Sequence, residues 1–297
     1  MALSACQNLI ADDLRELVDH GPELFPVACY HDDLARDAVA WHFHEELELV
    51  LVSEGVSEIA VGQEKFLVRK GQGFFINTGI LHGAWNASKG SCRFHSVVFH
   101  PRLVGGSQES IFWQNYLRPL MSPSGPKGCF FDLSEHWHKE ALEVLEQCWQ
   151  ACYHEPAGYE FTVRESLSRI IFLLRSHLNS AQSVISDKAI RDAERMKTML
   201  TFIQSHLRDP LTTTAIARSA SISVSECLRC FHNTIGSTPI QYLKQARIQE
   251  AADLLRLTDL KVSQIGERCG FQEMSYFAKT FRELRGCTPT EYRERGK

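Results

Sequence analysis

Three histidines and one glutamate are the residues of this 297-residue chain whose types and spacing best suit chemistry. Imidazole nitrogens and a carboxylate oxygen are donors that suit Fe, Mn, Ni or Zn, and they also hydrogen-bond organic ligands. His42, His44 and Glu48 have the same parity, so in one strand they would share a face. The group predicts a divalent metal site, direct contacts to a small-molecule ligand, or structural hydrogen bonding, through His42, His44, Glu48 and His82.

The elements that must position these residues are short apolar runs broken by glycine, from about residue 26 to residue 101. Runs such as HFHEELELVLVSEG and RFHSVVFH have the spacing of strands in a small all-β barrel or sandwich. Trp85 lies beside the polar positions, as aromatic side chains do in small-molecule pockets. We therefore expect an effector site formed by His42, His44, Glu48, His82 and Trp85.

The same stretch contains the spacing H-x-H-x3-E-x6-G followed by H-x3-N, formed by His42, His44, Glu48 and Gly55 and then by His82 and Asn86. These two strings resemble the two motifs of the cupin β-barrel. The resemblance implies a cupin-like fold over roughly residues 27 to 101. It leaves open whether the barrel holds a metal or an organic effector without metal.

An internal repeat is the strongest pattern, and it occupies the last hundred or so residues. Apolar and turn residues of the first copy recur about 50 positions later, notably Phe231, Gly236 and Tyr242 as Phe281, Gly286 and Tyr292. Each copy predicts a short helix, a tight turn and a second helix that ends at a glycine. The intervening segment PIQYLKQARIQEAADLLRLT has no interior glycine or proline, which predicts one long connecting helix.

The second helix of each copy is a candidate DNA-reading helix. A helix fits the major groove, and side chains at i, i+3, i+4 and i+7 share the face that enters it. These positions are Ser225, Leu228, Arg229 and His232 in the first copy and Ser275, Ala278, Lys279 and Arg282 in the second. We expect phosphate contacts from His232 and Arg282, and base contacts from Ser225, Arg229, Ser275 and Lys279. Arg229 is the best candidate because its guanidinium can satisfy both acceptors of guanine; the alternative for each is a solvated surface residue.

The segment from about Met196 to Arg293 resembles the DNA-binding domain of the AraC/XylS transcription regulators. The matching strings include RIQEAADLLRLT, IGERCGF and SYFAKTFRELRGCTPTEYR. The resemblance implies two helix-turn-helix units with recognition helices in successive major grooves of promoter DNA. It also implies a homodimer that works with RNA polymerase, and we expect the dimer contact on the helices at 135–154 and 161–178.

Length and charge divide the chain into two parts. The chain exceeds the usual size of a single core, and residues 191–297 hold 17 Lys and Arg against 12 Asp and Glu, behind an acidic front part. We expect an α+β two-domain protein. Residues 1–180 form a cupin-like sensing and dimerisation domain, with the barrel at about 26–101 and helices at about 110–178. Residues 181–192 are the expected linker, and residues 193–297 are an all-α domain of two helix-turn-helix units joined by the long helix.

The sequence shows neither a signal-peptide pattern nor a membrane-spanning segment, which bears on the expected cellular compartment. The amino terminus has no basic and apolar signal-peptide pattern, and no segment approaches the roughly 18 apolar residues of a membrane span. The cysteines are scattered, which favours reduced packing residues, including the close pairs Cys148/Cys152 and Cys227/Cys230. We therefore expect a cytoplasmic protein with no membrane partner.

These features together predict a sequence-specific transcription regulator, with activator as its expected mode, and not an enzyme. A small-molecule effector in the barrel controls its engagement with promoter DNA, and a divalent metal is the one possible cofactor. One alternative is a metal-dependent enzyme, such as a dioxygenase or isomerase, that carries a DNA-binding tail. A second alternative is a front domain that only dimerises, so that the protein responds to its own abundance.

Overall fold

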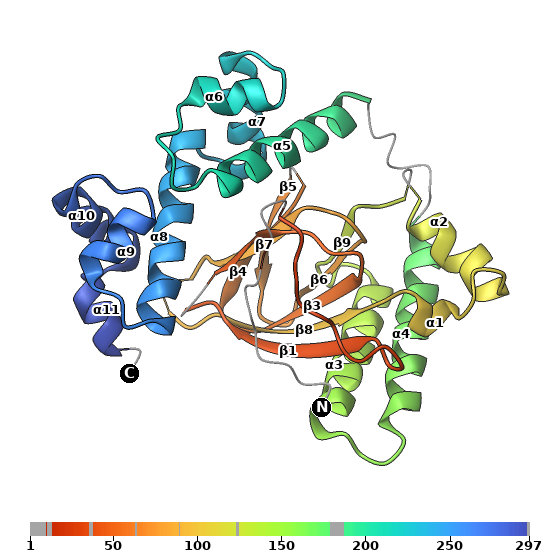
Figure 1. The fold of residues 1–297 in the computed structure, drawn as a ribbon. Helices are drawn as coiled ribbons and strands as arrows, with labels where there is room; N and C mark the ends of the chain where they lie inside the picture. The colour runs from red at the N-terminus through yellow and green to blue at the C-terminus, as the bar shows by residue number, and fades with distance from the viewer. Residues whose placement is uncertain are drawn as a thin grey trace. The chain divides into compact units, whose positions relative to one another are not determined.

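The computed structural model describes residues 10, 14–35, 38–62, 64–88, 90–122, 125–178 and 187–295 (Figure 1). The chain divides into two compact units, one that contains Arg15–Ile190 and one that contains Arg191–Lys297. Among the helices in the described ranges, none combines the length and the apolar character needed to cross a membrane.

The N-terminal unit is a sandwich of two antiparallel sheets. The five-stranded sheet has the order β1-β8-β3-β6-β9, and the four-stranded sheet has the order β2-β7-β4-β5. The strands are β1 (Val27–Asp33), β2 (Val39–His42), β3 (Leu47–Glu54), β4 (Val56–Val61), β5 (Glu64–Arg69), β6 (Gly73–Ile76), β7 (His82–Asn86), β8 (Arg93–Phe99) and β9 (Gly128–Phe131). The predicted cupin-like β-fold is confirmed, since the strands β1 to β8 lie within the expected stretch.

Strand β3 is central to its sheet and is buried on both faces. Leu47 and Leu49 belong to the apolar cluster shared with the helices, whereas Val50 and Val52 belong to the cluster between the two sheets. Because successive side chains of a strand point to opposite faces, Glu48 shares the inner face with Val50. A carboxylate is thereby placed inside the sandwich.

Two long helices, α3 (His136–His154) and α4 (Tyr159–His177), pack against each other and cover the five-stranded sheet (Figure 1). Their apolar faces are buried, with Leu145, Trp149 and Ile170 in the shared cluster. The Trp149 indole Nε1 donates a hydrogen bond to the Tyr30 carbonyl oxygen on β1 at 2.8 Å. Cys148 and Cys152 are fully buried in this layer, as expected of packing residues.

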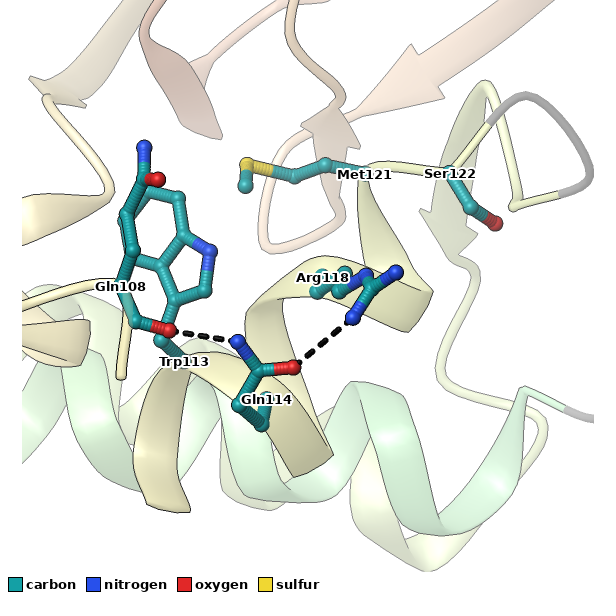
Figure 2. A pocket seen from close by; sticks show the side chains of 6 residues that line it. All are labelled: Gln108, Trp113, Gln114, Arg118, Met121 and Ser122. Atoms are coloured by element: carbon teal, nitrogen blue, oxygen red, sulfur yellow. Dashed lines mark hydrogen bonds between the residues drawn. The ribbon is translucent and has the colours of Figure 1, made fainter. Parts of the chain in front are cut away.

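The segment between β8 and α3 differs from the sequence prediction. It contains α1 (Arg102–Gly105), the π-helix η1 (Trp113–Leu117) and α2 (Arg118–Leu120), and then strand β9, which pairs with β6. The prediction of helices alone over residues 110–178 is therefore wrong, because the short apolar run GCFF completes a sheet edge. An open hollow of about 610 Å³ lies beside η1 (Figure 2), lined by Gln108, Trp113, Gln114, Arg118, Met121 and Ser122.

The C-terminal unit is helical in its described part. Its helices are α5 (Asp187–Ser205), α6 (Thr213–Ser219), α7 (Val224–Ile235), α8 (Pro239–Leu257), α9 (Val262–Arg268), α10 (Met274–Arg285) and α11 (Pro289–Arg295). The linker predicted at 181–192 is wrong from Asp187 onward, because DKAIRD suits a helix and begins α5. Residues 181–186 lie outside the described residues.

Both copies of the repeat form the predicted helix-turn-helix. The pairs are α6 with α7 and α9 with α10, and the repeated residues Phe231 and Phe281 are fully buried and plug the core of each unit. Each second helix ends at a glycine in the left-handed region, with φ of 73° at Gly236 and 72° at Gly286. Gly266 permits the close approach of α10, since a Cβ there would lie 2.7 Å from the Met274 Cε.

Cys227 and Cys230, which lie within α7, are buried. Burial raises the pKa of the Cys227 thiol to about 11, so this thiol stays protonated at neutral pH. Within the described residues the pair is a packing feature, as the sequence predicts.

The long helix α8 joins the two helix-turn-helix units through Arg247. Its guanidinium donates to the carbonyl oxygens of Leu207 at 2.7 Å and Asp209 at 2.6 Å, both in the connection between α5 and α6. The same group lies over the ring of Phe271, in the turn of the second unit, at 5.9 Å. One side chain therefore links the connection before the first unit to the turn of the second unit.

Candidate functional site

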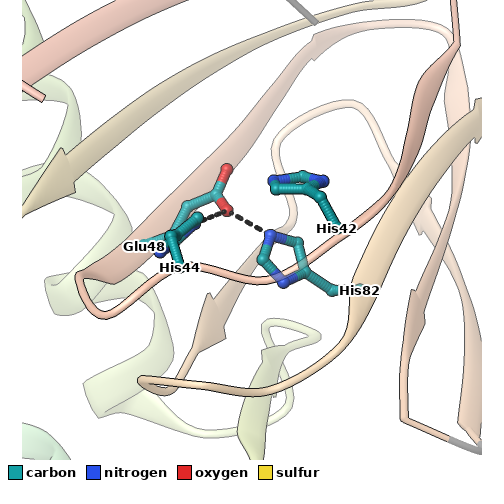
Figure 3. Close-up of side chains that lie close together, drawn as sticks. All are labelled: His42, His44, Glu48 and His82. Carbon is teal, nitrogen blue, oxygen red and sulfur yellow. Dashed lines mark ion pairs between the residues drawn. The ribbon is translucent and has the colours of Figure 1, made fainter. Parts of the chain in front are cut away.

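The four residues predicted to form a donor cluster do converge inside the sandwich (Figure 3). His42 ends β2 and pairs directly with His82 at the start of β7, so the strand register brings these two imidazoles together. His44 lies in the turn that follows β2, and Glu48 lies on β3. The assumption of one continuous strand is wrong, because the chain turns between His42 and Glu48, yet one ligand atom from each residue lies within 4.8 Å of the others.

The contacts centre on the Glu48 carboxylate. Its Oε2 lies 3.0 Å from the His82 Nε2 and 3.4 Å from the His44 Nε2. The rings of His42 and His82 lie 4.2 Å apart. All four side chains are nearly or fully buried, with side-chain exposures of 11% or less.

Each imidazole is oriented by a backbone carbonyl. The Nδ1 atoms of His42, His44 and His82 lie 2.8, 3.2 and 2.7 Å from the carbonyl oxygens of Ala40, Glu46 and Ile80. A carbonyl can only accept, so each Nδ1 carries the proton and donates it. In a neutral ring this leaves the Nε2 lone pair free to act as a ligand, which is the arrangement found around protein-bound metals.

Three buried atoms of the cluster lack a proper hydrogen bond. The Nε2 of His44, the Nε2 of His82 and the Oε2 of Glu48 have no hydrogen-bond partner among the described residues, although they lie close together. Unpaired buried polar atoms cost free energy, and their convergence therefore indicates that something else satisfies them.

The electrostatics favour the ligand forms of Glu48 and His42. Burial disfavours a charged carboxylate, but the contacts with His44 and His82 outweigh it and lower the pKa of Glu48 well below its usual value. Burial, reinforced by the charge of His82, lowers the pKa of His42 to about 3. At neutral pH Glu48 is therefore an anion and His42 is uncharged.

Two further polar residues face this site, and the sequence interpretation missed both. Glu16 lies with its Oε2 3.6 Å from the His42 Nε2 and 3.0 Å from the His20 Nε2. The His20 Nδ1 lies 2.8 Å from the Tyr30 hydroxyl. Glu16 is positioned by the backbone, since its N–H donates to the Phe43 carbonyl oxygen at 3.0 Å. The local sequence carried no signal for this contact, which depends on chain segments far apart in sequence.

The space at the cluster is small. A cavity of about 40 Å³ is lined by residues that include Glu16, His20, His42, His44 and Glu48. Trp85 is not among the lining residues. It stands three positions after His82 on β7, hence on the opposite face, where its ring lies 5.3 Å from that of Trp41. Its predicted role in the effector site is therefore wrong.

The predicted DNA-reading positions lie on the outer side of α7 and α10. The exposed members are Ser225, Leu228, His232, Ser275, Lys279 and Arg282, while Arg229 and Ala278 are partly exposed. Each face is backed by a buried one, which includes Cys227 and Phe231 on α7 and Phe277 and Phe281 on α10. The two helices thus present free surfaces of the predicted composition.

Arg229 is the exception, because its guanidinium is engaged within the unit. It forms a two-point contact with Glu226, at 3.0 Å from Nε to Oε2 and 2.6 Å from Nη2 to Oε1. The same Nη2 lies 2.9 Å from the buried Asp192 carboxylate on α5. Sequence reasoning could not foresee this contact, since Asp192 precedes Arg229 by 37 residues.

Comparison with known proteins agrees with both units. The family described as AraC-like ligand binding domain matches residues 24–157, and the family described as helix-turn-helix domain matches residues 216–295. The chain belongs to the AraC family of transcription regulators. This AraC family member is thus a DNA-binding regulator with a ligand-binding sensor domain, and the alternative of a metal-dependent enzyme is set aside.

The relatives of this AraC family member cover its whole architecture. It is 28% identical to the HTH-type transcriptional regulator YdeC of Bacillus subtilis, over 97% of this chain and 99% of the relative. It is 24% identical to the HTH-type transcriptional activator RhaR of Escherichia coli K12, over 88% and 89%. Apo ToxT from Vibrio cholerae, a solved structure, covers 90% of this chain with 97% of its own, at 15% identity and a TM-score of 0.45.

Proposed function

We propose that the protein is a homodimeric, cytoplasmic activator that binds promoter DNA through α7 and α10 and acts on RNA polymerase. Occupancy of the sandwich cavity by an effector changes the affinity for the promoter. A ligand can shift such an equilibrium only if it binds one arrangement better than the other. The observation that carries the proposal is the pair of exposed reading faces in a chain that also has a buried, unsatisfied donor cluster.

The DNA contacts divide by chemistry. Ser225, Ser275 and Lys279 are proposed to reach base edges, because their side chains can donate hydrogen bonds to groove acceptors. His232 and Arg282 stand near the ends of their helices and are proposed to contact phosphates. Leu228 and Ala278 are proposed to lie against the groove between these polar contacts.

The occupant that best fits the cluster is a divalent transition-metal ion, held by His42, His44, Glu48 and His82. Pockets for organic ligands usually measure roughly 300 to 1,000 Å³, whereas the cavity measures about 40 Å³. Three oriented Nε2 atoms and one carboxylate are a donor set that suits Zn, Fe, Ni or Mn. The ion would supply positive charge that satisfies the three unpaired atoms.

An organic effector has a different location available. The hollow beside η1, at about 610 Å³, has the size of a small-molecule pocket, with an indole and a guanidinium in its lining. It becomes the effector site if the sandwich cavity proves to bind neither metal nor any other ligand.

Metal binding is tested by titrating purified full-length protein with Zn²⁺, Ni²⁺, Fe²⁺ and Mn²⁺ in a calorimeter and by elemental analysis. We expect one ion per chain and loss of binding in Glu48→Gln and His82→Asn. His31→Asn is the matched control, because His31 is an exposed histidine on β1 outside the cluster. Equal binding by all four proteins would refute the site.

Control of DNA binding is tested separately, by fluorescence anisotropy on promoter fragments with and without the bound ion. A salt-dependent affinity that changes on metal addition supports the proposal, because phosphate contacts release counterions. Salt-independent binding to every fragment would refute DNA binding through α7 and α10. An affinity insensitive to metal would refute the ion as effector.

The dimer contact is proposed on the outer side of α4. Phe161 and Phe172 stand 11 residues apart, about three helical turns, so they share a face. Their exposed fractions are 82% and 43%, so both rings are available to a partner chain. Light scattering on Phe161→Glu should report a monomer, whereas an unchanged mass would exclude this face.

A further inference from the structure

The internal repeat allows the two recognition helices to be compared position by position. Arg229 in α7 corresponds to Lys279 in α10, and Leu228 corresponds to Ala278, since each pair is separated by 50 residues. The two cationic positions have different surroundings. Lys279 and its neighbour Arg282 are exposed and form no ion pair with any residue in the described ranges.

Arg229, by contrast, is part of a four-residue network. It contacts Glu226 at two points and Asp192 at 2.9 Å, while Arg195 lies 3.4 Å from both carboxylates. The Asp192 side chain is only 5% exposed. If Arg229 turned toward DNA, this buried carboxylate would keep only the longer contact with Arg195, and leaving a buried charge underpaired is unfavourable. Arg229 therefore acts as a strut between α5 and α7.

Two apolar side chains stand on the first part of the outer face of α7, ahead of His232. Val224 and Leu228 stand four residues apart on the same side of the helix, with exposed fractions of 38% and 39%. Ser225 lies beside them and is exposed. In the major groove the apolar group available to such side chains is the C5-methyl group of thymine.

The outer face of α10 has the opposite character. Lys279 has no ion-pair partner within the described ranges, and Ser275 and Arg282 stand on the same face. In the major groove, lysine and arginine pair with the O6 and N7 acceptors of guanine. Ala278 leaves room where α7 has a leucine.

We propose that the two units read different chemistry: α7 reads thymine methyl groups through Val224 and Leu228, and α10 reads guanine through Lys279. This division rests on the proposed function, in which both helices enter major grooves. It makes Leu228 and Lys279 the specificity-determining residues and makes Arg229 a positioning residue.

The test begins with selection of bound duplexes from a random-sequence pool by the full-length protein. The selected site should contain one half defined by A·T pairs and one half that contains guanine. Leu228→Ala should lose the preference in the A·T half only, and Lys279→Ala should lose the guanine only. The double variant Arg229→Met with Asp192→Asn removes both members of the internal pair and should select the wild-type site.

Replacement of thymine by deoxyuridine in the selected site then removes single methyl groups. We expect about a fourfold loss of affinity at the thymine that Leu228 contacts, the value of one buried methyl group, and no loss at that same thymine in Leu228→Ala. A guanine that disappears from the first half in the Arg229→Met, Asp192→Asn variant would overturn this inference alone. Failure of the wild-type protein to enrich any sequence would overturn it together with the proposed function.

Discussion

Removal of the Arg229 side chain should loosen the contact between α5 and α7. In Arg229→Ala, the Asp192 carboxylate loses its 2.9 Å partner and keeps only Arg195 at 3.4 Å. Breaking a buried ion pair costs about 3 to 5 kcal/mol. Arg229 is 33% exposed, so water replaces part of the contact, and we expect about 1 to 3 kcal/mol.

Native-state hydrogen exchange, read by mass spectrometry on the full chain, measures this loss locally. Peptides from α5 and α7 should exchange about 5- to 150-fold faster, since 1.4 kcal/mol corresponds to a factor of ten. Peptides from α10 should not change. Lys279→Ala, the equivalent position in the second unit, is the matched control and should stay within about 0.5 kcal/mol.

The double variant Arg229→Met with Asp192→Asn distinguishes two roles of Arg229, a packing contact between α5 and α7 and a contact to DNA. Without a buried charge it should recover most of the protection that Arg229→Ala loses. Unchanged exchange of α5 and α7 in Arg229→Ala would refute the reasoning, because Arg229 would then contribute nothing to the packing of the first unit.

Four further substitutions test the packing. Gly286→Ala should cost about 1 kcal/mol of unfolding free energy through its positive φ alone. Gly270→Ala should cost more, because its Cβ would lie 2.9 Å from the Arg208 carbonyl oxygen. Equal melting temperatures of the two variants by circular dichroism would contradict this. Phe281→Ala should cost about 3 to 5 kcal/mol in denaturant unfolding, since it empties the centre of the second unit, and a loss below 1 kcal/mol would contradict its role as a plug. Trp149→Phe should cost about 1 kcal/mol through the lost hydrogen bond to Tyr30, read by the remaining tryptophan fluorescence, and a neutral result would contradict that contribution.

The helical half of the fold was largely predictable because its signals are local and duplicated. Glycine at the end of each second helix, phenylalanine at the plug and the uninterrupted α8 segment are readable from neighbouring residues, and the repeat checks each assignment twice. Strand β9 was not predicted, because four residues carry too little periodicity to distinguish a strand from a helix segment.

The site was predictable only in part. The donor spacing identified His42, His44, Glu48 and His82, which the structure places on β2, the segment after it, β3 and β7. Glu16 could not be found, because only tertiary folding brings it near His42. The internal contact of Arg229 was not predicted for the same reason. Helical spacing identifies the face on which a side chain lies but not its partner on another helix. The prediction for Trp85 was wrong because Trp85 stands three positions after His82 on one strand and so faces the opposite side. That spacing is readable from the sequence.

The bond network of Arg247 has a consequence for the operator. A single guanidinium contacts both the connection before α6 and the turn before α10, so we expect it to restrain the separation of the two recognition helices. The two halves of the operator must then keep one spacing. Inserting about five base pairs between them, half a duplex turn, rotates one half to the opposite side of the double helix. The spacing between the two operator halves along the duplex should therefore matter for binding as much as their base sequence does.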